Sequence, residues 1–264
     1  MAIDFDGTLL RSDGTISART ASAIRRIDGV GVRVIVVTGR PPRWLGPIAE
    51  LLGHRGMAIA ANGALVIDLE TRDVVASTHL EIPAARTVIE RLRDEFPSAT
   101  FGVERPDGFA HEQGYPRGIR NSERMPEVAY ADTLDELLAS APVKILVRVS
   151  DTDTDIDTAA ERAVAALDGV ASVYFSGTDL LEIAAADVSK ASTLARVASA
   201  WDVRPEAVMA FGDMPNDIPM LEWAGHAVAV ANAHPRVHAV ADTITASNDD
   251  DGVALVLERF LDSV

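Results

Sequence analysis

The chain has 264 residues, of which 48% are apolar, and this length can bury the core of one large α/β domain or of two ordinary domains. Its formal net charge of −16 argues against nucleic acid or an anionic membrane as a partner, because both bind basic surfaces. No apolar run approaches the ~18 residues of a membrane-spanning helix, and the lack of cysteine excludes disulfides, thiolate nucleophiles and cysteine-ligated zinc. The sequence starts without a signal-like segment, so we expect a cytoplasmic protein, and no pattern indicates an oligomeric state. Lysine is rare, because 24 basic residues include only Lys144 and Lys190.

Residues 1–37 predict a strand, a helix and a second, parallel strand. The first apolar run ends in Asp4-Phe5-Asp6-Gly7-Thr8, and Ser17 is suited to cap the helix that follows. The β-branched run at 32–37 is typical of a buried parallel strand and ends in Thr38-Gly39.

Beyond this unit we expect a helix over 42–52 and a hairpin of strands 58–61 and 64–67, joined by an Asn62-Gly63 turn. From about residue 82 to residue 185 the pattern changes to that of a separate α+β module. Within it we expect helices over 83–95 and 158–167, and strands near 100–103, 109–112, 144–149, 173 and 180–183.

The alternation of strand and helix then resumes. We expect a helix over 189–200, a strand over 207–211, a helix over 218–223, a strand over 227–230, and a last strand and helix within 243–261. The sequence therefore predicts a doubly wound, Rossmann-like parallel-sheet core formed by residues 1–81 and 186–264, with an α+β domain inserted at 82–185.

Asp4 and Asp6 stand two positions apart where the first predicted strand ends. Alternate residues of a strand face the same side, so both carboxylates can point beyond its carboxyl end, where open α/β sheets hold ligands. Two carboxylates there can hold a divalent cation such as Mg²⁺, and an ionised Asp can act as a nucleophile through an aspartyl-phosphate. Ordinary turn chemistry is the alternative, because Asp and Gly are common turn residues.

Two further groups are candidates to bind phosphate. Thr38-Gly39 offers a hydroxyl and an amide at the end of the second strand, although Thr-Gly is equally a routine strand exit. Lys190 falls in the first turn of a predicted helix, where the macrodipole disfavours a cation by about 0.3–1 kcal/mol. Because the chain otherwise uses Arg, and an ammonium is more compact than a guanidinium, this lysine is suited to a place between carboxylates and a phosphate. An ordinary surface lysine is the alternative.

A third polar group follows the strand predicted at 207–211. Gly212-Asp213 ends that strand, and Asn216 and Asp217 lie on the next loop, before a helix. Helix capping is the alternative interpretation, but it accounts for one of these residues rather than for all of them.

Taken together, these motifs resemble those of the haloacid dehalogenase-like phosphatases, across both flanks of the predicted core. The set is, in chain order, Asp4-Phe5-Asp6-Gly7-Thr8-Leu9-Leu10, Val36-Val37-Thr38-Gly39-Arg40, Lys190, and Gly212-Asp213 with Asn216-Asp217. Further segments resemble the Cof-type subgroup, namely Asn62-Gly63-Ala64, Met220-Leu221, Ala231-Asn232-Ala233, Ser247-Asn248 and Asp251-Gly252-Val253. Members of this subgroup carry a large cap domain where the insert falls here. They usually have several residues before the first Asp, whereas three precede it in this chain, so we expect a clipped first strand.

The resemblance implies a role for each matching residue. Asp4 would be the nucleophile. Asp6 would be the acid that protonates the leaving alcohol and then the base that activates water, a role that requires a raised pKa of Asp6. The implied phosphate-binding residues are Thr38, Gly39, Asn62, Lys190 and Asn216. The implied Mg²⁺ ligands are Asp4, Asp6 through its main-chain carbonyl, Asp213 and Asp217, the last in a supporting position.

The implied activity is Mg²⁺-dependent hydrolysis of a small phosphorylated metabolite, with sugar phosphates, nucleotides and cofactor phosphates all open. One alternative is a phosphomutase that moves phosphate within a sugar. Another is a non-enzymatic phospho-receiver, which also gathers acids, a Thr and a Lys around Mg²⁺. Receivers are usually about half this length and need an acceptor Asp at the end of the middle strand, where we expect Thr38.

Three other patterns are weaker. The acidic run 151–155 imitates a calcium loop but lacks the glycine that its turn needs, so we interpret it as a solvated helix entrance. His234 and His238 have the spacing of a metal pair without an adjacent Glu, which favours a surface helix. Arg117 and Arg120 are candidates to meet an anionic substrate, with a solvated loop as the alternative.

Overall fold

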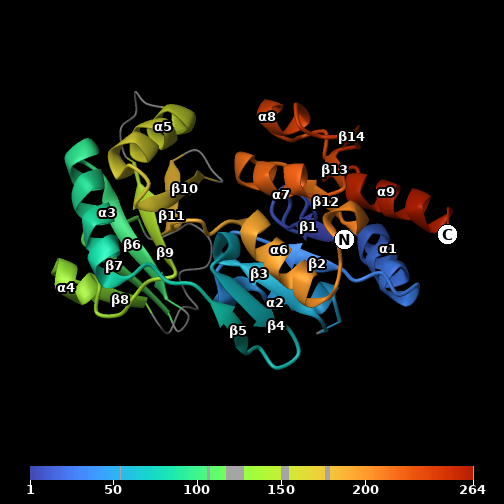
Figure 1. Cartoon of the computed structure of the whole chain (residues 1–264), viewed down its shortest axis with the longest axis horizontal. Coiled ribbons are helices and arrows are strands. Elements are labelled where there is room, and N and C mark those ends of the chain that lie inside the picture. Colours follow the sequence, from blue (N-terminus) through green and yellow to red (C-terminus); the bar gives the residue numbers. More distant parts are fainter. Residues whose placement is uncertain (54, 106–107, 117–127, 150–154, 176–178, 264) are drawn as a thin grey trace. The chain divides into compact units, whose positions relative to one another are not determined.

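The computed structural model describes residues 1–53, 55–105, 108–116, 128–149, 155–175 and 179–263, which form two compact units (Figure 1). The first unit joins Met1–Ala76 to Ser189–Val264, and the second is the continuous segment Ser77–Val188. The boundaries expected from the sequence, after residues 81 and 185, differ from these by a few residues.

A mostly parallel sheet organises the first unit. Its eight strands, counted within the described residues, lie in the order β14-β13-β12-β1-β2-β3-β4-β5. The strands from β14 to β3 run parallel to their neighbours, and β4 is antiparallel to β3. The strands are β1 (Ala2–Asp4), β2 (Ile35–Val37), β3 (Met57–Ala60), β4 (Leu65–Asp68), β5 (Val74–Ser77), β12 (Met209–Gly212), β13 (His226–Ala229) and β14 (Thr243–Ile244).

Helices connect the parallel strands, and the α/β class predicted from the sequence is confirmed. α1 packs against α9, and α6 packs against α7 (Figure 1). The helices of this unit are α1 (Ala18–Gly29), α2 (Gly46–Leu51), α6 (Lys190–Ala200), α7 (Ile218–Trp223), α8 (Pro235–His238) and α9 (Gly252–Leu261). Short 3₁₀ turns are η1 (Pro42–Trp44), η2 (Ala61–Gly63), η4 (Pro205–Ala207) and η5 (Pro215–Asp217).

Local sequence explains why the first unit folds this way. Every residue of β1 and β2 is buried, as expected of central parallel strands that are covered on both faces. The Ser17 side chain accepts a hydrogen bond from the Thr20 amide and so caps α1, as predicted. Ile24 and Ile27 lie on the buried face of that helix.

The connection between β3 and β4 is the 3₁₀ turn η2 rather than a two-residue hairpin turn. Asn62 in this turn has a φ of 56°, in the left-handed region. A Cβ atom on Gly63 would lie 2.1 Å from the carbonyl oxygen of Ser189, so only glycine allows this turn to approach the start of α6.

The second unit contains a largely antiparallel sheet with the strand order β10-β11-β9-β6-β7-β8. Only the β7/β8 pair within its described part is parallel. Its strands are β6 (Thr100–Arg105), β7 (Gly108–Glu112), β8 (Val128–Ala131), β9 (Lys144–Arg148), β10 (Ala171–Phe175) and β11 (Leu180–Ala185), and its helices are α3 (Ile82–Glu95), α4 (Leu134–Leu137) and α5 (Ile156–Leu167). α3 packs against α5, so the unit has the α+β composition that was predicted.

Several weaker patterns can be placed in this fold. Asp155 caps α5 by accepting from the Thr158 amide, as a helix entrance would, whereas residues 151–154 lie outside the described residues. Arg117 and Arg120 also lie outside them. His234 caps the short helix α8, and His238 is bonded to the Val230 carbonyl. Among the described helices, none combines the length and the apolar character needed to cross a membrane.

Candidate active site

The carboxyl ends of three adjacent parallel strands bring the predicted polar residues together. Asp4 is the last residue of β1 and is paired in register with Val37 of β2, so Thr38 follows at the same edge of the sheet. On the other side of β1 lies β12, whose last residue, Gly212, precedes Asp213. Asp4 therefore lies on the central strand of the three, between the threonine and the acidic loop.

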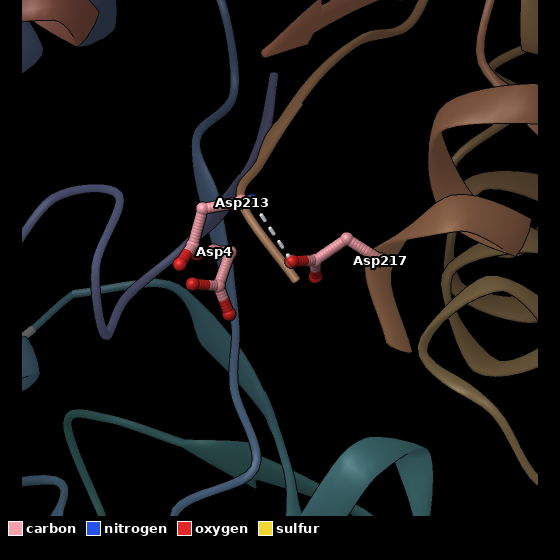
Figure 2. A group of neighbouring side chains, drawn as sticks. All are labelled: Asp4, Asp213 and Asp217. Carbon is pink, nitrogen blue, oxygen red and sulfur yellow. Dashed lines mark hydrogen bonds between the residues drawn. The ribbon is translucent and has the colours of Figure 1, made fainter. Parts of the chain in front are cut away.

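Asp4, Asp213 and Asp217 form a cluster of buried carboxylates (Figure 2). Each offers an oxygen atom, and these atoms all lie within 4.8 Å of one another. The three side chains point toward one another, Asp4 and Asp213 from strand ends and Asp217 from η5. Thr8 donates a 2.8 Å hydrogen bond to Asp213 Oδ1, which fixes the orientation of that carboxylate.

Lys190 is the cation of this cluster. Its Nζ donates to Asp4 Oδ1 over 2.6 Å and to Asp217 Oδ1 over 2.7 Å, and its side chain is 2% exposed. Ser189 caps α6 through a capping box with Ser192, which fixes the first turn of the helix where Lys190 stands. The unfavourable place of a cation near this helix N-terminus is thus offset by two direct carboxylate contacts.

The charges of the cluster do not balance, because three carboxylates face one ammonium. Burial is the main reason that the pKa of Asp4 is raised well above its usual range. Lys190 acts to lower this pKa, but the neighbouring charges of Asp217 and Asp213 raise it further. Burial and the Asp217 charge raise the pKa of Asp213 to about 7. Burial by itself would lower the pKa of Lys190, but Asp217 and Asp4 outweigh it and raise that pKa. The cluster therefore has an excess of negative charge that a proton or a cation can neutralise.

Asp217 has two structural roles as well as its contact with Lys190. Its Oδ2 accepts hydrogen bonds from the amides of Asp213 (3.1 Å) and Met214 (3.0 Å), so it closes the loop after β12. A Cβ atom on Gly212 would lie 2.6 Å from the Asp217 Cβ, which shows how closely the loop is folded. The same side chain therefore closes the loop through backbone amides and contacts Lys190.

Gly7 makes room for Asp213 in the loop that follows β1. It has a φ of +81°, and a Cβ atom there would lie 2.3 Å from Asp213 Oδ2. Both the backbone conformation and the space thus require glycine.

A second part of the site is formed by Thr38, Asn62 and Asn216. Thr38 is fully buried, and its carbonyl accepts from the Asn62 amide over 3.1 Å. Asn216 Nδ2 donates to Asn62 Oδ1 over 3.2 Å, whereas Asn216 Oδ1 is buried and has no partner among the described residues. An unpartnered buried amide oxygen is the kind of group that a donor on a ligand or a cation satisfies.

Asp6 lies apart from the carboxylate cluster. Its side chain forms a two-point ion pair with Arg40, in which Arg40 Nη2 lies 2.7 Å from Asp6 Oδ1. The side chain of Asp6 is 43% exposed, whereas Asp4 is buried. The two acids of the first motif therefore occupy different surroundings.

Two asparagines hold the loop that contains Gly7. Asn232 Nδ2 donates to the Gly7 carbonyl over 2.8 Å, and Asn232 Oδ1 accepts from the Asn248 amide over 2.9 Å. Asn248 Nδ2 in turn donates to the Leu10 carbonyl over 2.8 Å. Segments near the C-terminus thereby fix the loop that follows β1.

Sequence reasoning assigned no role to Thr8, Arg40, Asn232 or Asn248. Thr8 and Arg40 stand within the motifs that carry the family resemblance, so their position was a usable signal. The contacts of the two asparagines with a loop more than two hundred residues away had no local signal.

Comparison with known proteins identifies the class to which this site belongs. The family model of the haloacid dehalogenase-like hydrolases matches residues 1–257. The chain belongs to that family. A divalent metal ion is generally used by hydrolases of this family, and the buried Asp cluster is present here.

Relatives of known name support the phosphatase class. A 5-amino-6-(5-phospho-D-ribitylamino)uracil phosphatase from Bacillus subtilis is 30% identical over 277 residues, which span 99% of this chain and 95% of the relative. A second phosphatase from Bacillus subtilis is 28% identical over 291 residues, covering 99% of both chains. The structure of a phosphatase of this superfamily from Bacteroides thetaiotaomicron has a TM-score of 0.82 and 26% identity, covering 98% of this chain and 93% of that one. The Cof-type phosphatase expected from the motifs is confirmed.

Proposed function

We propose that the protein hydrolyses a small phosphorylated metabolite through an aspartyl-phosphate formed on Asp4, in a reaction that depends on Mg²⁺. The observation that carries this proposal is the place of the Asp4 carboxylate, buried at the end of the central strand and in contact with Lys190. A carboxylate held in this way has a fixed direction of attack, and it needs a positive partner to approach a phosphate dianion.

The phosphoryl group would be bound by Lys190, Thr38, Gly39, Asn62 and Asn216. Lys190 donates to Asp4, and Thr38 follows the β2 residue that is paired with Asp4, so both would supply hydrogen-bond donors where charge develops on the phosphoryl oxygens. The Asn62–Asn216 hydrogen bond joins the turn after β3 to the turn after β12, so both amides are fixed on the same side of the site.

In the first step a carboxylate oxygen of Asp4 forms a bond to phosphorus while the bond to the leaving alcohol oxygen breaks. The carboxyl group of Asp6 gives its proton to that oxygen. In the second step Asp6 removes a proton from a water molecule, whose oxygen bonds to phosphorus as the Asp4–phosphorus bond breaks. Inorganic phosphate leaves, and both aspartates return to their starting forms.

The residues present fit a magnesium ion. Asp4 and Asp213 would hold it together with the main-chain carbonyl of Asp6, and Asp217 would support it, so the excess negative charge of the cluster would be neutralised. Such an ion supplies positive charge that lessens the repulsion between the Asp4 carboxylate and a phosphate dianion.

The leaving group would be a metabolite alcohol, and the inserted unit of residues 77–188 would select it. The Bacillus subtilis relative that is 30% identical acts, by its name, on a phosphorylated ribityl compound. That ester is an alkyl phosphate, so we include ribityl phosphates with sugar phosphates, nucleotides and cofactor phosphates among the substrates to be tested.

Phosphate release from this panel, with and without Mg²⁺, tests the proposal. Asp4→Asn should abolish turnover, since an amide cannot attack phosphorus, whereas the matched exposed change Asp28→Asn should leave turnover intact. Substantial hydrolysis by Asp4→Asn would contradict the proposed mechanism. Phosphate released in stoichiometric amount would exclude the phosphomutase alternative.

A phospho-receiver would instead keep its aspartyl-phosphate for a long time without turnover. The argument that placed Thr38 at the end of the middle strand does not hold for the parallel part of the sheet, whose two middle strands in the described part of the chain are β12 and β1, and Asp4 is the last residue of β1. The length of the chain, its inserted unit and its family membership still argue against a receiver.

A further inference from the structure

Asn232 joins the loop after β13 to the loop after β1. It stands between β13 and α8, and its Nδ2 donates a 2.8 Å hydrogen bond to the Gly7 carbonyl. Its Oδ1 accepts a 2.9 Å hydrogen bond from the Asn248 amide, in the segment after β14. Both polar atoms of this side-chain amide therefore hold backbone groups that belong to distant segments of the chain.

The same loop also holds the backbone of Asp213. The His234 amide, two residues after Asn232, donates a 2.8 Å hydrogen bond to the Asp213 carbonyl. The loop after β13 is thus bonded both to the loop after β1 and to the loop after β12. These two loops carry residues proposed to bind Mg²⁺, namely Asp6 through its main-chain carbonyl, Asp213 and Asp217.

Gly7 is the point at which the contact of Asn232 reaches the proposed cation site. Thr8, the next residue, donates a 2.8 Å hydrogen bond to Asp213 Oδ1. Gly7 itself lies so close to the other carboxylate oxygen that a Cβ atom on it would be 2.3 Å from Asp213 Oδ2. Because a peptide group is planar, a hydrogen bond to the Gly7 carbonyl fixes the plane that joins Gly7 to Thr8. The orientation of the Asp213 carboxylate therefore depends on this peptide.

Other hydrogen bonds anchor the end of the loop after β1. The Leu10 amide donates to the Phe5 carbonyl over 2.8 Å, and the Leu10 carbonyl accepts from Asn248 Nδ2 over 2.8 Å. The contact of Asn232 instead holds the middle of the loop, next to Thr8.

We propose that Asn232 is a positioning residue for the cation site, which holds the Gly7–Thr8 peptide so that the Asp213 carboxylate is oriented before Mg²⁺ binds. This inference rests on the Mg²⁺ site of the proposed function. Residues that orient a metal ligand without touching the metal typically change its affinity by about 10–100-fold when they are replaced. In this role Asn232 acts on the ion through the loop rather than by direct contact.

The test is Asn232→Ala, with Mg²⁺ as the only ligand. Asn232 is exposed, so this change removes two hydrogen bonds without opening a cavity in the core. We expect the dissociation constant of Mg²⁺, measured by calorimetric titration of the protein without substrate and at constant pH, to rise about 10-fold. The urea midpoint of the metal-free protein should fall only slightly, which distinguishes a lost orientation from a lost fold.

Ser12→Ala is the matched control. Ser12 is also exposed, and its hydroxyl donates a 2.7 Å hydrogen bond to Asp249. This bond likewise joins the chain after β1 to the segment after β14, but it does not hold the Gly7 carbonyl. The dissociation constant of Mg²⁺ should therefore be the same in Ser12→Ala as in the wild-type protein.

A double-mutant cycle with Thr8→Val tests the route from Asn232 to the carboxylate. Valine has a similar shape to threonine but cannot donate to Asp213 Oδ1, so the contact that transmits the effect is lost. If Asn232 acts through this contact, adding Asn232→Ala to Thr8→Val should weaken Mg²⁺ binding much less than it does in the wild-type protein.

Three results would each overturn the inference while the wild-type protein still bound Mg²⁺. They are an unchanged dissociation constant in Asn232→Ala, an equal rise in Ser12→Ala, and full additivity in the cycle. A wild-type protein that bound no Mg²⁺ would instead contradict the proposed cation site, and with it this inference.

Discussion

The ammonium of Lys190 donates a 2.6 Å hydrogen bond to Asp4, from a position 186 residues further along the chain. The same ammonium contacts Asp217, so the positive charge of one lysine is shared between two carboxylates that come from different segments of the chain. Its small size matters because both contacts are short and the side chain is buried.

Replacing this lysine should affect activity and stability in different ways. In Lys190→Arg the larger guanidinium cannot fit both contacts, and we expect kcat to fall about 10²-fold or more, as for the loss of a preorganised donor. In Lys190→Met the carboxylates lose their only cation among the described contacts, and the free energy of unfolding should fall by about 3–5 kcal/mol. Phosphate release and urea denaturation measure the two effects, and a fully active Lys190→Arg enzyme would contradict the assigned role.

The raised pKa of Asp213 predicts a link between pH, stability and Mg²⁺. Its pKa is about 7 in the folded protein and 3.8 in its ordinary state, so the folded protein binds this proton more tightly than the unfolded chain does. The stability contributed by that proton is fully present below pH 3.8 and is lost as the pH rises through about 7. In Asp213→Asn this part of the pH dependence should disappear from the metal-free thermal midpoint.

Because the ion would replace the proton, Mg²⁺ should raise the thermal midpoint more at about pH 8 than at about pH 5. The control is again Asp213→Asn, in which the increase should be small at both values. A wild-type increase that does not depend on pH would count against Asp213 as a ligand.

Gly7 allows a test of the space around the cluster. In Gly7→Ala the new Cβ would lie 2.3 Å from Asp213 Oδ2, so this carboxylate must move, and both Mg²⁺ stabilisation and kcat should be lost. Gly14 has the same φ of +81° with nothing within 4 Å of a new Cβ. Gly14→Ala should therefore show only the strain of the left-handed backbone, about 1–2 kcal/mol. Equal effects of the two changes on Mg²⁺-induced thermal shifts would contradict the close-packing explanation.

Much of the fold could be predicted because central parallel strands consist of uninterrupted runs of apolar residues. β2 is an example, since each of its residues is buried. The strands β5 (Val74–Ser77) and β8 (Val128–Ala131) were not predicted. All residues of β5 and most of β8 are exposed, so burial imposes no alternating pattern on them.

The meeting of the side chains in the candidate site could be predicted where a residue was unusual in its place. Lys190 is such a residue, because it is rare in this chain and stands at a helix N-terminus. Arg40 gave no such signal, since arginine is the usual basic residue here. The approach of η2 to α6, which depends on Gly63, was hidden because Asn-Gly is also a common hairpin turn.

The separation of the site residues along the chain has a consequence for how the protein forms during synthesis. Thr8 and Asp213 are 205 positions apart, and Lys190 is 186 positions from Asp4, whereas the second unit is one continuous segment. Contacts between distant residues form late, because the entropy of closing long loops must be overcome first. The inserted unit can therefore fold on the ribosome before the site exists, and the nascent chain should acquire its cation affinity only after the loop containing Asp217 has emerged.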